Sequence, residues 1–380
     1  MSARFTSFVL WLVLTAWPVH ANDMFVYFGT HASGPGKGFS LAHFDTDTGA
    51  LTKPKFLIAD EMPAFFVIHP DGHHLYTCNS TNTLHGEGWI SAYAIEPKTG
   101  QLTFLNRKSS GGSNPSYITL DKTSRFALVA NYQGGNVTVT AIKPDGSLGD
   151  RTGSDQHTGH SVNPERQTQP YAHSIIVDPS NRFALSADLG VDKLYIYRFD
   201  EHDGSLMPIP PFVAVKPGSG PRHVKFHPNA RWVYLINELA NTVTGFNWNA
   251  AKGSLAEFQT ISTLPAGFTG SNTAAELEIH PNGRFLYGSN RGHDSLVVFA
   301  IDPANGKLSL VEHVSSRGKL PRNFTFDPTG RWILCTNHGS DNAVVFRVDD
   351  ATGKLARLGL PIEVPFPFCE RFLPVAKPKN

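Results

Sequence analysis

The sequence has little of several features that would define a function class. Its 33 basic and 32 acidic residues leave a net charge of +1, so the charge favours neither nucleic acid nor an anionic membrane as a partner. Only 3 cysteines occur among 380 residues, and none has CxxC spacing. We expect Cys78, Cys335 and Cys369 to be buried thiols, with one disulfide possible if two of them meet.

Motifs for several chemistries are also missing. There is no HExxH or comparable histidine spacing, and His73–His74 fall on a predicted turn, so no metal is expected. There is no GxSxG elbow for a nucleophilic serine. The GSG at 218–220 lacks the strand–GxGxxG–helix context of a dinucleotide site. We therefore expect no cofactor.

Long apolar runs are absent, with one short exception near the N-terminus. Arg4 precedes an apolar run from Phe8 to Trp17, and Val19-His20-Ala21 follows. This layout is typical of a secretory signal peptide cleaved after Ala21, and the run is shorter than the roughly 20 residues that span a bilayer. A buried N-terminal helix is the alternative. We expect a signal peptide over 1–21, one domain over 22–380, a periplasmic or secreted protein, and no membrane insertion after cleavage.

What the chain does contain is a repeat. A strand followed by a glycine turn and a leucine recurs, and its glycines are spaced by 46 to 58 residues. Glycine suits a positive φ in such a hairpin loop. The seven copies have their glycines at Gly49, Gly100, Gly146, Gly204, Gly253, Gly306 and Gly353.

A hairpin of the form apolar-x-Pro-x-x-Arg-aromatic-apolar precedes six of these units, as in KFHPNARWVYLIN and EIHPNGRFLYGSN. The missing half-copy is divided between the termini. Residues 24–30 resemble the second hairpin strand, and PFCERFLP at 367–374 matches the first. Four short strands in roughly 50 residues are the size of a propeller blade. The sequence therefore predicts an all-β, seven-bladed β-propeller with four antiparallel strands per blade, closed by pairing of the N- and C-terminal strands in one blade.

The direction of the strands predicts where polar residues gather. Each first strand runs into the Pro-Asn-Gly-Arg turn and the second runs back, so the start of the first and the end of the second share one mouth. Charge concentrates there in consecutive blades, and the other wall is mainly neutral. Such a mouth suits an anionic small molecule, although Asn and Asp at strand ends also bond loop backbone. The candidates are His173, Asp188, Arg222, His223, Glu238, Glu276, Asn290, Arg291 and Arg322.

Several segments resemble one known family. RQTQPYAHS (166–174), DLGVD (188–192), GPRH (220–223), NELANTV (237–243), GFTGSNTAAEL (267–277) and SNRGHDS (289–295) are similar to the seven-bladed propeller lactonases. That family includes 6-phosphogluconolactonases and fungal 3-carboxy-cis,cis-muconate lactonizing enzymes. The resemblance covers essentially the whole mature chain and implies His173, Arg222, Glu238 and Arg291 as catalytic residues. Tyr171 and His338 depart from the His and Gln that many members carry there.

The expected function is therefore hydrolysis of a sugar-acid lactone, 6-phosphogluconolactone or a related gluconolactone, by a carboxylic-ester hydrolase. His173 is the expected base or acid. Glu238, with a low pKa beside two arginines, is expected to orient His173 or to serve as the base in its place. Arg222 and Arg291 bind phosphate or carboxylate. Glu276, Arg322, His223, Asp188 and Asn290 are expected to contact substrate.

Two alternatives remain, a carboxymuconate cycloisomerase and a non-catalytic exported propeller that binds a ligand. A mouth blocked by loops, or His173 turned into the core, would favour the second. A monomer is expected.

Overall fold

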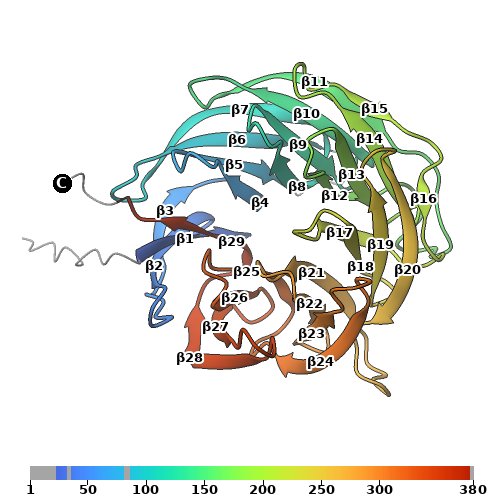
Figure 1. Ribbon diagram of the computed structural model, residues 1–380. Coiled ribbons are helices and arrows are strands. Elements are labelled where there is room, and N and C mark those ends of the chain that lie inside the picture. Colours follow the sequence, from blue (N-terminus) through green and yellow to red (C-terminus); the bar gives the residue numbers. More distant parts are fainter. Residues whose placement is uncertain (1–22, 32–35, 81–85, 377–380) are drawn as a thin grey trace, which may run out of the picture.

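The computed structural model describes residues 23–31, 36–80 and 86–376, and in this part of the chain every regular element is a β-strand. Seven sheets are arranged in a ring (Figure 1), which confirms the predicted propeller. No helix in the described residues is long and apolar enough to cross a membrane. The predicted signal peptide at 1–21 lies outside the described residues.

The predicted closure is also confirmed. The C-terminal strand β29 (Pro367–Pro374) pairs antiparallel with the N-terminal strand β1 (Asp23–Thr30). The closing blade is completed by β2 (Gly38–Asp45) and β3 (Lys55–Ala59). Because the innermost strand of this blade comes from the end of the chain, main-chain hydrogen bonds tie the two ends together and the ring has no open edge.

The other blades follow in chain order and are numbered 1 to 6. Blade 1 contains β4 (Pro63–Ile68), β5 (His74–Asn79), β6 (Glu87–Ile95) and β7 (Leu102–Ser113). Blade 2 contains β8 (Pro115–Leu120), β9 (Phe126–Asn131), β10 (Asn136–Ile142) and β11 (Leu148–Gln156). Blade 3 contains β12 (Ala172–Val177), β13 (Phe183–Asp188), β14 (Lys193–Phe199), β15 (Leu206–Pro208) and β16 (Val213–Ala214).

Blade 4 contains β17 (Pro221–Phe226), β18 (Trp232–Asn237), β19 (Thr242–Asn249) and β20 (Ser254–Ser262). Blade 5 contains β21 (Thr273–Ile279), β22 (Phe285–Arg291), β23 (Ser295–Ile301) and β24 (Leu308–Ser315). Blade 6 contains β25 (Pro321–Phe326), β26 (Trp332–Asn337), β27 (Asn342–Val348) and β28 (Leu355–Glu363).

Blade 3 departs slightly from the expected four strands, because its outer strand is divided. The short strands β15 and β16 both pair with β14. Pro208, Pro210 and Pro211 lie in or between them, and proline has no N–H with which to continue a ladder.

The second strand of most blades is buried on both faces because it is packed between neighbouring sheets. In β9, β13, β18 and β26 every residue is buried, which explains continuous apolar runs such as FALVAN in β9. The outermost strand β28 is mostly exposed. All three cysteines are buried free thiols, as expected.

The repeated glycines join neighbouring blades. All seven have positive φ between 64° and 80°, as predicted. A Cβ on Gly306 would lie 2.6 Å from the Trp232 ring of the preceding blade. The carbonyl of the same glycine accepts a 2.6 Å hydrogen bond from the Tyr234 hydroxyl. The glycine turn and the Arg-aromatic hairpin of the preceding blade are therefore two halves of one contact, repeated around the ring.

Candidate active site

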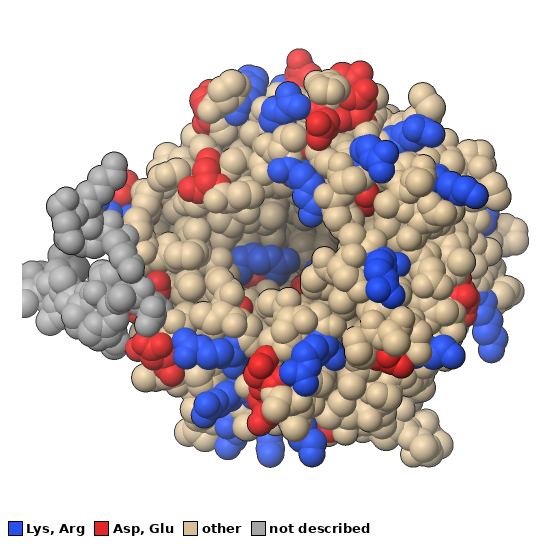
Figure 2. Space-filling view, in the orientation of Figure 1, with Lys and Arg blue, Asp and Glu red and all other residues tan. Residues whose placement is uncertain are grey.

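A cavity of about 370 Å³ opens where the innermost strands begin, a size within the roughly 300–1,000 Å³ of small-ligand sites. A face of the ring is hollowed at its centre, and Lys or Arg side chains lie inside the hollow (Figure 2). The residues that line the cavity come from all seven blades and are His31, Ala64, Ser80, Asn114, Ser116, Tyr132, Arg166, His173, Glu238, Thr273, Arg291, Arg322 and Phe368.

Each innermost strand has a β-bulge near its start. In β17, Pro221 pairs with Asn237 and His223 pairs with Ile236, so Arg222 is the extra residue. A bulge redirects the extra side chain. The same register shift makes an extra residue of Ala64, Ser116, His173, Arg322 and Phe368. These five line the cavity, whereas Arg222 is buried and is not among the lining residues.

Glu238, directly after β18, connects the charged wall. Its Oε1 lies 2.7 Å from Nη2 of Arg166, and its Oε2 lies 2.9 Å from Nη2 of Arg291 and 3.1 Å from Nε of Arg222. Burial alone would raise the pKa of Glu238, but Arg291, Arg222, His173 and Arg166 outweigh it and hold the pKa well below its usual range. The carboxylate is therefore ionised and fixes three guanidinium groups.

Arg322 has no such partner. Its guanidinium carbon lies 4.3 Å above the centre of the Phe368 ring, and no carboxylate of the described residues forms an ion pair with it. Burial, followed by Arg222 and Arg291, lowers the pKa of Arg322 to about 9, so the group is still charged at neutral pH. The lining contains three arginines and one carboxylate, a net charge of +2, which suits an anionic ligand. Arg222 is not part of the lining and pairs with Glu238 from its buried position.

His173 lies beside this charged wall. Its Nε2 is 3.9 Å from Oε2 of Glu238, and its ring packs edge-on against Tyr132 and His223. Burial, then Arg222 and His223, lower the pKa of His173 well below its usual value. The imidazole is therefore neutral at pH 7, and its Nδ1 is buried without a hydrogen-bond partner. A neutral imidazole that faces a cavity can accept a proton.

Two predicted substrate contacts lie beneath the cavity rather than in its lining. Nδ1 of His223 is 2.8 Å from Oε1 of Glu276, and the other carboxylate oxygen of Glu276 accepts a hydrogen bond from Asn323. Both side chains are almost fully buried. They support Arg222, whose Nη1 lies 3.3 Å from Nδ1 of His223 and donates to the Ala275 carbonyl at 2.6 Å. Neither residue is part of the cavity lining, and their contact with a substrate stays a prediction.

Asp188 and Asn290, also predicted to contact substrate, bond loops instead. Oδ1 of Asp188 accepts the N–H groups of Tyr171 and Gly190, and its Oδ2 is 2.6 Å from Nδ1 of His157. Asn290 exchanges two 2.8 Å hydrogen bonds with Thr263. Neither lines the cavity, because a strand-end side chain that satisfies adjacent backbone is turned away from the mouth.

Arg166 and Tyr132 were not predicted as site residues. Arg166 lies in the loop between β11 and β12, where Oδ1 of Asn163 accepts its N–H. Its Nη2 reaches Tyr132 Oη at 3.2 Å as well as Glu238. The available signal was its place at the start of RQTQPYAHS, but a loop residue has no fixed register with the mouth. Tyr171, a departure from the family pattern, stacks on Tyr132 at 4.8 Å.

The neutral wall is aromatic. His31 stacks on Phe368 at 4.2 Å, and His338 packs edge-on against the same ring at 5.5 Å. Burial and then Arg322 lower the pKa of both histidines to about 4. His338, the second departure from the family pattern, therefore adds no charge beside Arg322 at neutral pH.

A larger hollow of about 770 Å³ lies away from the axis, against β3 and β7. Its exposed aromatic residues include Phe56 and Phe104. Its buried carboxylate, Asp60, is paired with Arg107 at 2.7 Å. This hollow is larger, but Arg322, which has no carboxylate partner among the described residues, and the neutral His173 both line the cavity on the axis. We therefore take the cavity on the axis as the candidate site.

Comparison with known proteins agrees with this fold. The model of the seven-bladed β-propeller lactonase family matches residues 25–372. A 6-phosphogluconolactonase of Bacillus subtilis is 35% identical over 347 residues, which cover 91% of this chain and 97% of the relative. The chain belongs to the seven-bladed β-propeller lactonase family.

Solved structures of other lactonases are similar throughout. A periplasmic gluconolactonase of Pseudomonas aeruginosa superposes with a TM-score of 0.86 at 32% identity, covering 93% of this chain and 100% of the other. A putative 6-phosphogluconolactonase of Bacteroides fragilis superposes with a TM-score of 0.84 at 29% identity, covering 93% and 99%. The resemblance inferred from the sequence motifs is therefore confirmed at the level of the family.

Proposed function

We propose that this lactonase hydrolyses a sugar-acid lactone with an anionic substituent, most simply 6-phosphogluconolactone, and that gluconolactone is the related unphosphorylated substrate. The observation that carries the proposal is the excess of positive charge in the cavity, and in particular the unpaired guanidinium of Arg322. Arginine forks match phosphate and carboxylate oxygens with paired hydrogen bonds. The names of the relatives point to the same substrate class.

The reaction begins with a water molecule between His173 and Glu238. Nε2 of His173 and Oε2 of Glu238 are 3.9 Å apart, close enough for one water to contact both. The water oxygen attacks the lactone carbonyl carbon, and its proton passes to His173. The carbonyl oxygen becomes an oxyanion, and Arg291 at the cavity wall stabilises it. Removing such a donor typically costs roughly 3 kcal/mol of transition-state stabilisation.

The second half returns the proton. The bond from the carbonyl carbon to the ring oxygen breaks, and the leaving oxygen takes the proton from the His173 imidazolium to give a hydroxyl. Glu238 stabilises that imidazolium across 3.9 Å, while Arg222 and Arg166 hold the carboxylate in place. The negative charge of a bound phosphate would offset the arginines that lower the pKa of His173, so substrate binding itself makes the imidazole a better base.

We also propose that the chain is exported by cleavage after Ala21 and that it acts as a monomer with no cofactor. Support for export comes from the N-terminal sequence and from the periplasmic relative.

Proton release from 6-phosphogluconolactone and from gluconolactone, followed in a pH-stat with and without protein, tests the proposal. A rate above spontaneous hydrolysis is expected for both, with the lower KM for the phosphorylated lactone. No acceleration of either would favour the non-catalytic propeller, and conversion of a carboxymuconate alone would favour the cycloisomerase. Among the described residues the cavity is open and His173 lines it, so neither feature expected of the non-catalytic alternative is present in that part of the chain.

A further inference from the structure

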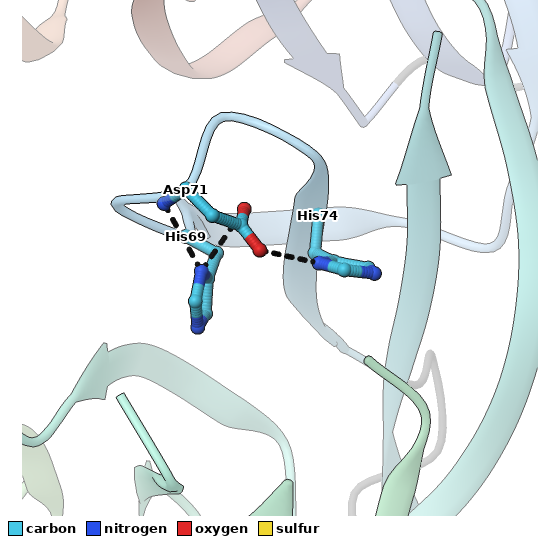
Figure 3. A group of neighbouring side chains, drawn as sticks. All are labelled: His69, Asp71 and His74. Atoms are coloured by element: carbon cyan, nitrogen blue, oxygen red, sulfur yellow. Dashed lines mark hydrogen bonds and ion pairs between the residues drawn. The ribbon is translucent and has the colours of Figure 1, made fainter. Parts of the chain in front are cut away.

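A group of three possible metal ligands lies in the hairpin turn between β4 and β5. This turn is at the far end of the β4 strand from Ala64, which lines the cavity. A six-residue strand is about 20 Å long, so the turn belongs to the opposite end of the ring. The group consists of His69, Asp71 and His74, which we call the turn cluster (Figure 3).

The residues of the turn cluster differ from those at the equivalent positions of the other five hairpins. At the position of His74 those hairpins carry only aromatic residues: Phe126, Phe183, Trp232, Phe285 and Trp332. At the position of Asp71 none carries an acid: Thr123, Ser180, Asn229, Asn282 and Thr329. The ring contact with the next blade is retained, because a Cβ on Gly146 would meet His74. The fold therefore requires a flat ring here but not an imidazole.

His69 has a structural counterpart in His227. In both hairpins Nδ1 accepts the N–H of the residue two positions later, at 3.2 Å from Asp71 and at 3.1 Å from Asn229. The other nitrogen of His227 also bonds the Gly283 carbonyl of the next blade, whereas no such bond is formed by His69 among the described residues. His69 therefore makes the turn cap of His227 without its hydrogen bond to the next blade, and its ring instead lies edge-on to His74 at 5.8 Å.

Asp71 also has one more acceptor oxygen than the turn uses. Its Oδ1 accepts the His73 N–H at 2.7 Å, the bond that Asn229 makes to Arg231 in its own hairpin. The acid offers a second oxygen that an amide would not, and this Oδ2 lies 3.0 Å from Nδ1 of His74.

The spacing of the ligand atoms fits a small divalent cation. Oδ1 of Asp71 is 3.0 Å from Nδ1 of His69, Oδ2 is 3.0 Å from Nδ1 of His74, and the three ligand atoms lie within 4.8 Å of one another. Zn²⁺ binds imidazole nitrogen and carboxylate oxygen at about 2.0–2.2 Å, which places tetrahedral ligand atoms roughly 3.3–3.6 Å apart, so the side chains would move outward by a few tenths of an ångström around the ion. The single lone pair of His69 Nδ1 accepts the Asp71 N–H at 3.2 Å in the ion-free turn, so an ion bound at this nitrogen would replace that long hydrogen bond.

We propose that the turn cluster is a surface site for a divalent transition metal ion, with Zn²⁺ as the simplest occupant. Two imidazoles and one carboxylate are a common ligand set for such ions and leave positions for water. The side chains are 18% to 35% exposed, so the ion has access from solvent. The ion would join the end of β4 to the first residue of β5 and thereby secure the turn that contacts blade 2.

The test is equilibrium dialysis of Zn²⁺ against the mature chain prepared without a polyhistidine tag. Two variants restore residues found in the other hairpins, His74→Phe and Asp71→Asn, so both should fold. His202→Ala removes an exposed histidine from a different loop and is the matched control. Melting curves verify that all four proteins are folded.

The wild type and His202→Ala should each bind one Zn²⁺ per chain. His74→Phe and Asp71→Asn should bind it roughly ten-fold or more weakly, because even loss of an outer-shell partner costs that much. The proposal is overturned if the wild type shows no saturable binding at submillimolar Zn²⁺. It is also overturned if all four proteins bind equally, since the metal would then be elsewhere.

Discussion

The Arg322→Met substitution tests whether the cavity recognises an anionic group. Methionine keeps an unbranched stem beside Phe368 but removes a cation that no carboxylate of the described residues neutralises. A hydrogen bond to a charged group contributes about 1.5–3 kcal/mol, and about 1.4 kcal/mol is a factor of ten. The KM for 6-phosphogluconolactone should therefore rise about 10- to 150-fold, and the KM for gluconolactone should change little.

Stability should not fall in this variant. Burial, Arg222 and Arg291 lower the pKa of Arg322 to about 9, so its charged form is less favourable in the folded chain than in the unfolded one. Arg231→Met is the matched control, because that guanidinium also lies over an aromatic ring, at 4.8 Å from Trp232, but in a hairpin turn at the opposite end of the ring. Steady-state kinetics with both lactones and a melting curve supply the measurements.

Two results would refute this reasoning. One is an equal rise of KM for both lactones, which would mean that Arg322 shapes the cavity rather than binding the anion. The other is an unchanged KM for the phosphorylated lactone.

Three further substitutions test the proton transfer and the buried carboxylates. His173→Ala should lower kcat about 10²- to 10⁴-fold with an unchanged near-UV spectrum, and a kcat near wild type would remove His173 as the base. Glu238→Gln leaves three guanidinium groups without their counter-ion and should cost about 3–5 kcal/mol of stability at pH 7. The folded chain lowers the pKa of Glu238, so the ionised carboxylate stabilises the fold above its unfolded pKa, and this stabilisation is lost as the pH falls below that value. The free energies of unfolding of wild type and Glu238→Gln should therefore become more similar in acid. A difference that stays constant with pH would contradict the ion-pair account. Burial raises the pKa of Glu370 to about 8, so the wild type loses stability as the pH rises from the unfolded pKa of this carboxyl to about 8. Glu370→Gln should therefore raise the melting temperature more at pH 8 than at pH 5. An equal rise at both pH values would show that ionisation of Glu370 is not the cause.

The chain's repeat was sufficient to predict the architecture. Each blade is a local unit whose glycine turn and Pro-Arg hairpin are visible in a few consecutive residues, such as Gly306 and the hairpin at Pro228. Counting them gives the number of blades, and the two half-copies at the termini give the closure between β1 and β29. The direction of the hairpin strands places the starts of the first strands and the ends of the second strands at one mouth. His173 and Arg322 come from such starts, and Glu238 and Arg291 come from such ends.

Tertiary structure decided which of those residues face the cavity. The position of a residue within a strand does not reveal a bulge. The bulges turn His173 and Arg322 into the mouth, while His223 lies beneath the residues that line the cavity. Asp188 is a strand-end residue like the predicted site residues, but its oxygens are taken by neighbouring backbone and His157.

The loop residue Arg166 was beyond sequence reasoning for a related reason, because only the folded ring brings it to Glu238, 72 positions away in the chain. By itself the sequence determined the ring and its polar mouth, since both follow from short-range patterns repeated along the chain. The net positive cavity, the neutral His173 and the turn cluster depend on distances of a few ångströms between side chains, and electrostatic energies and ligand geometry change steeply over such distances.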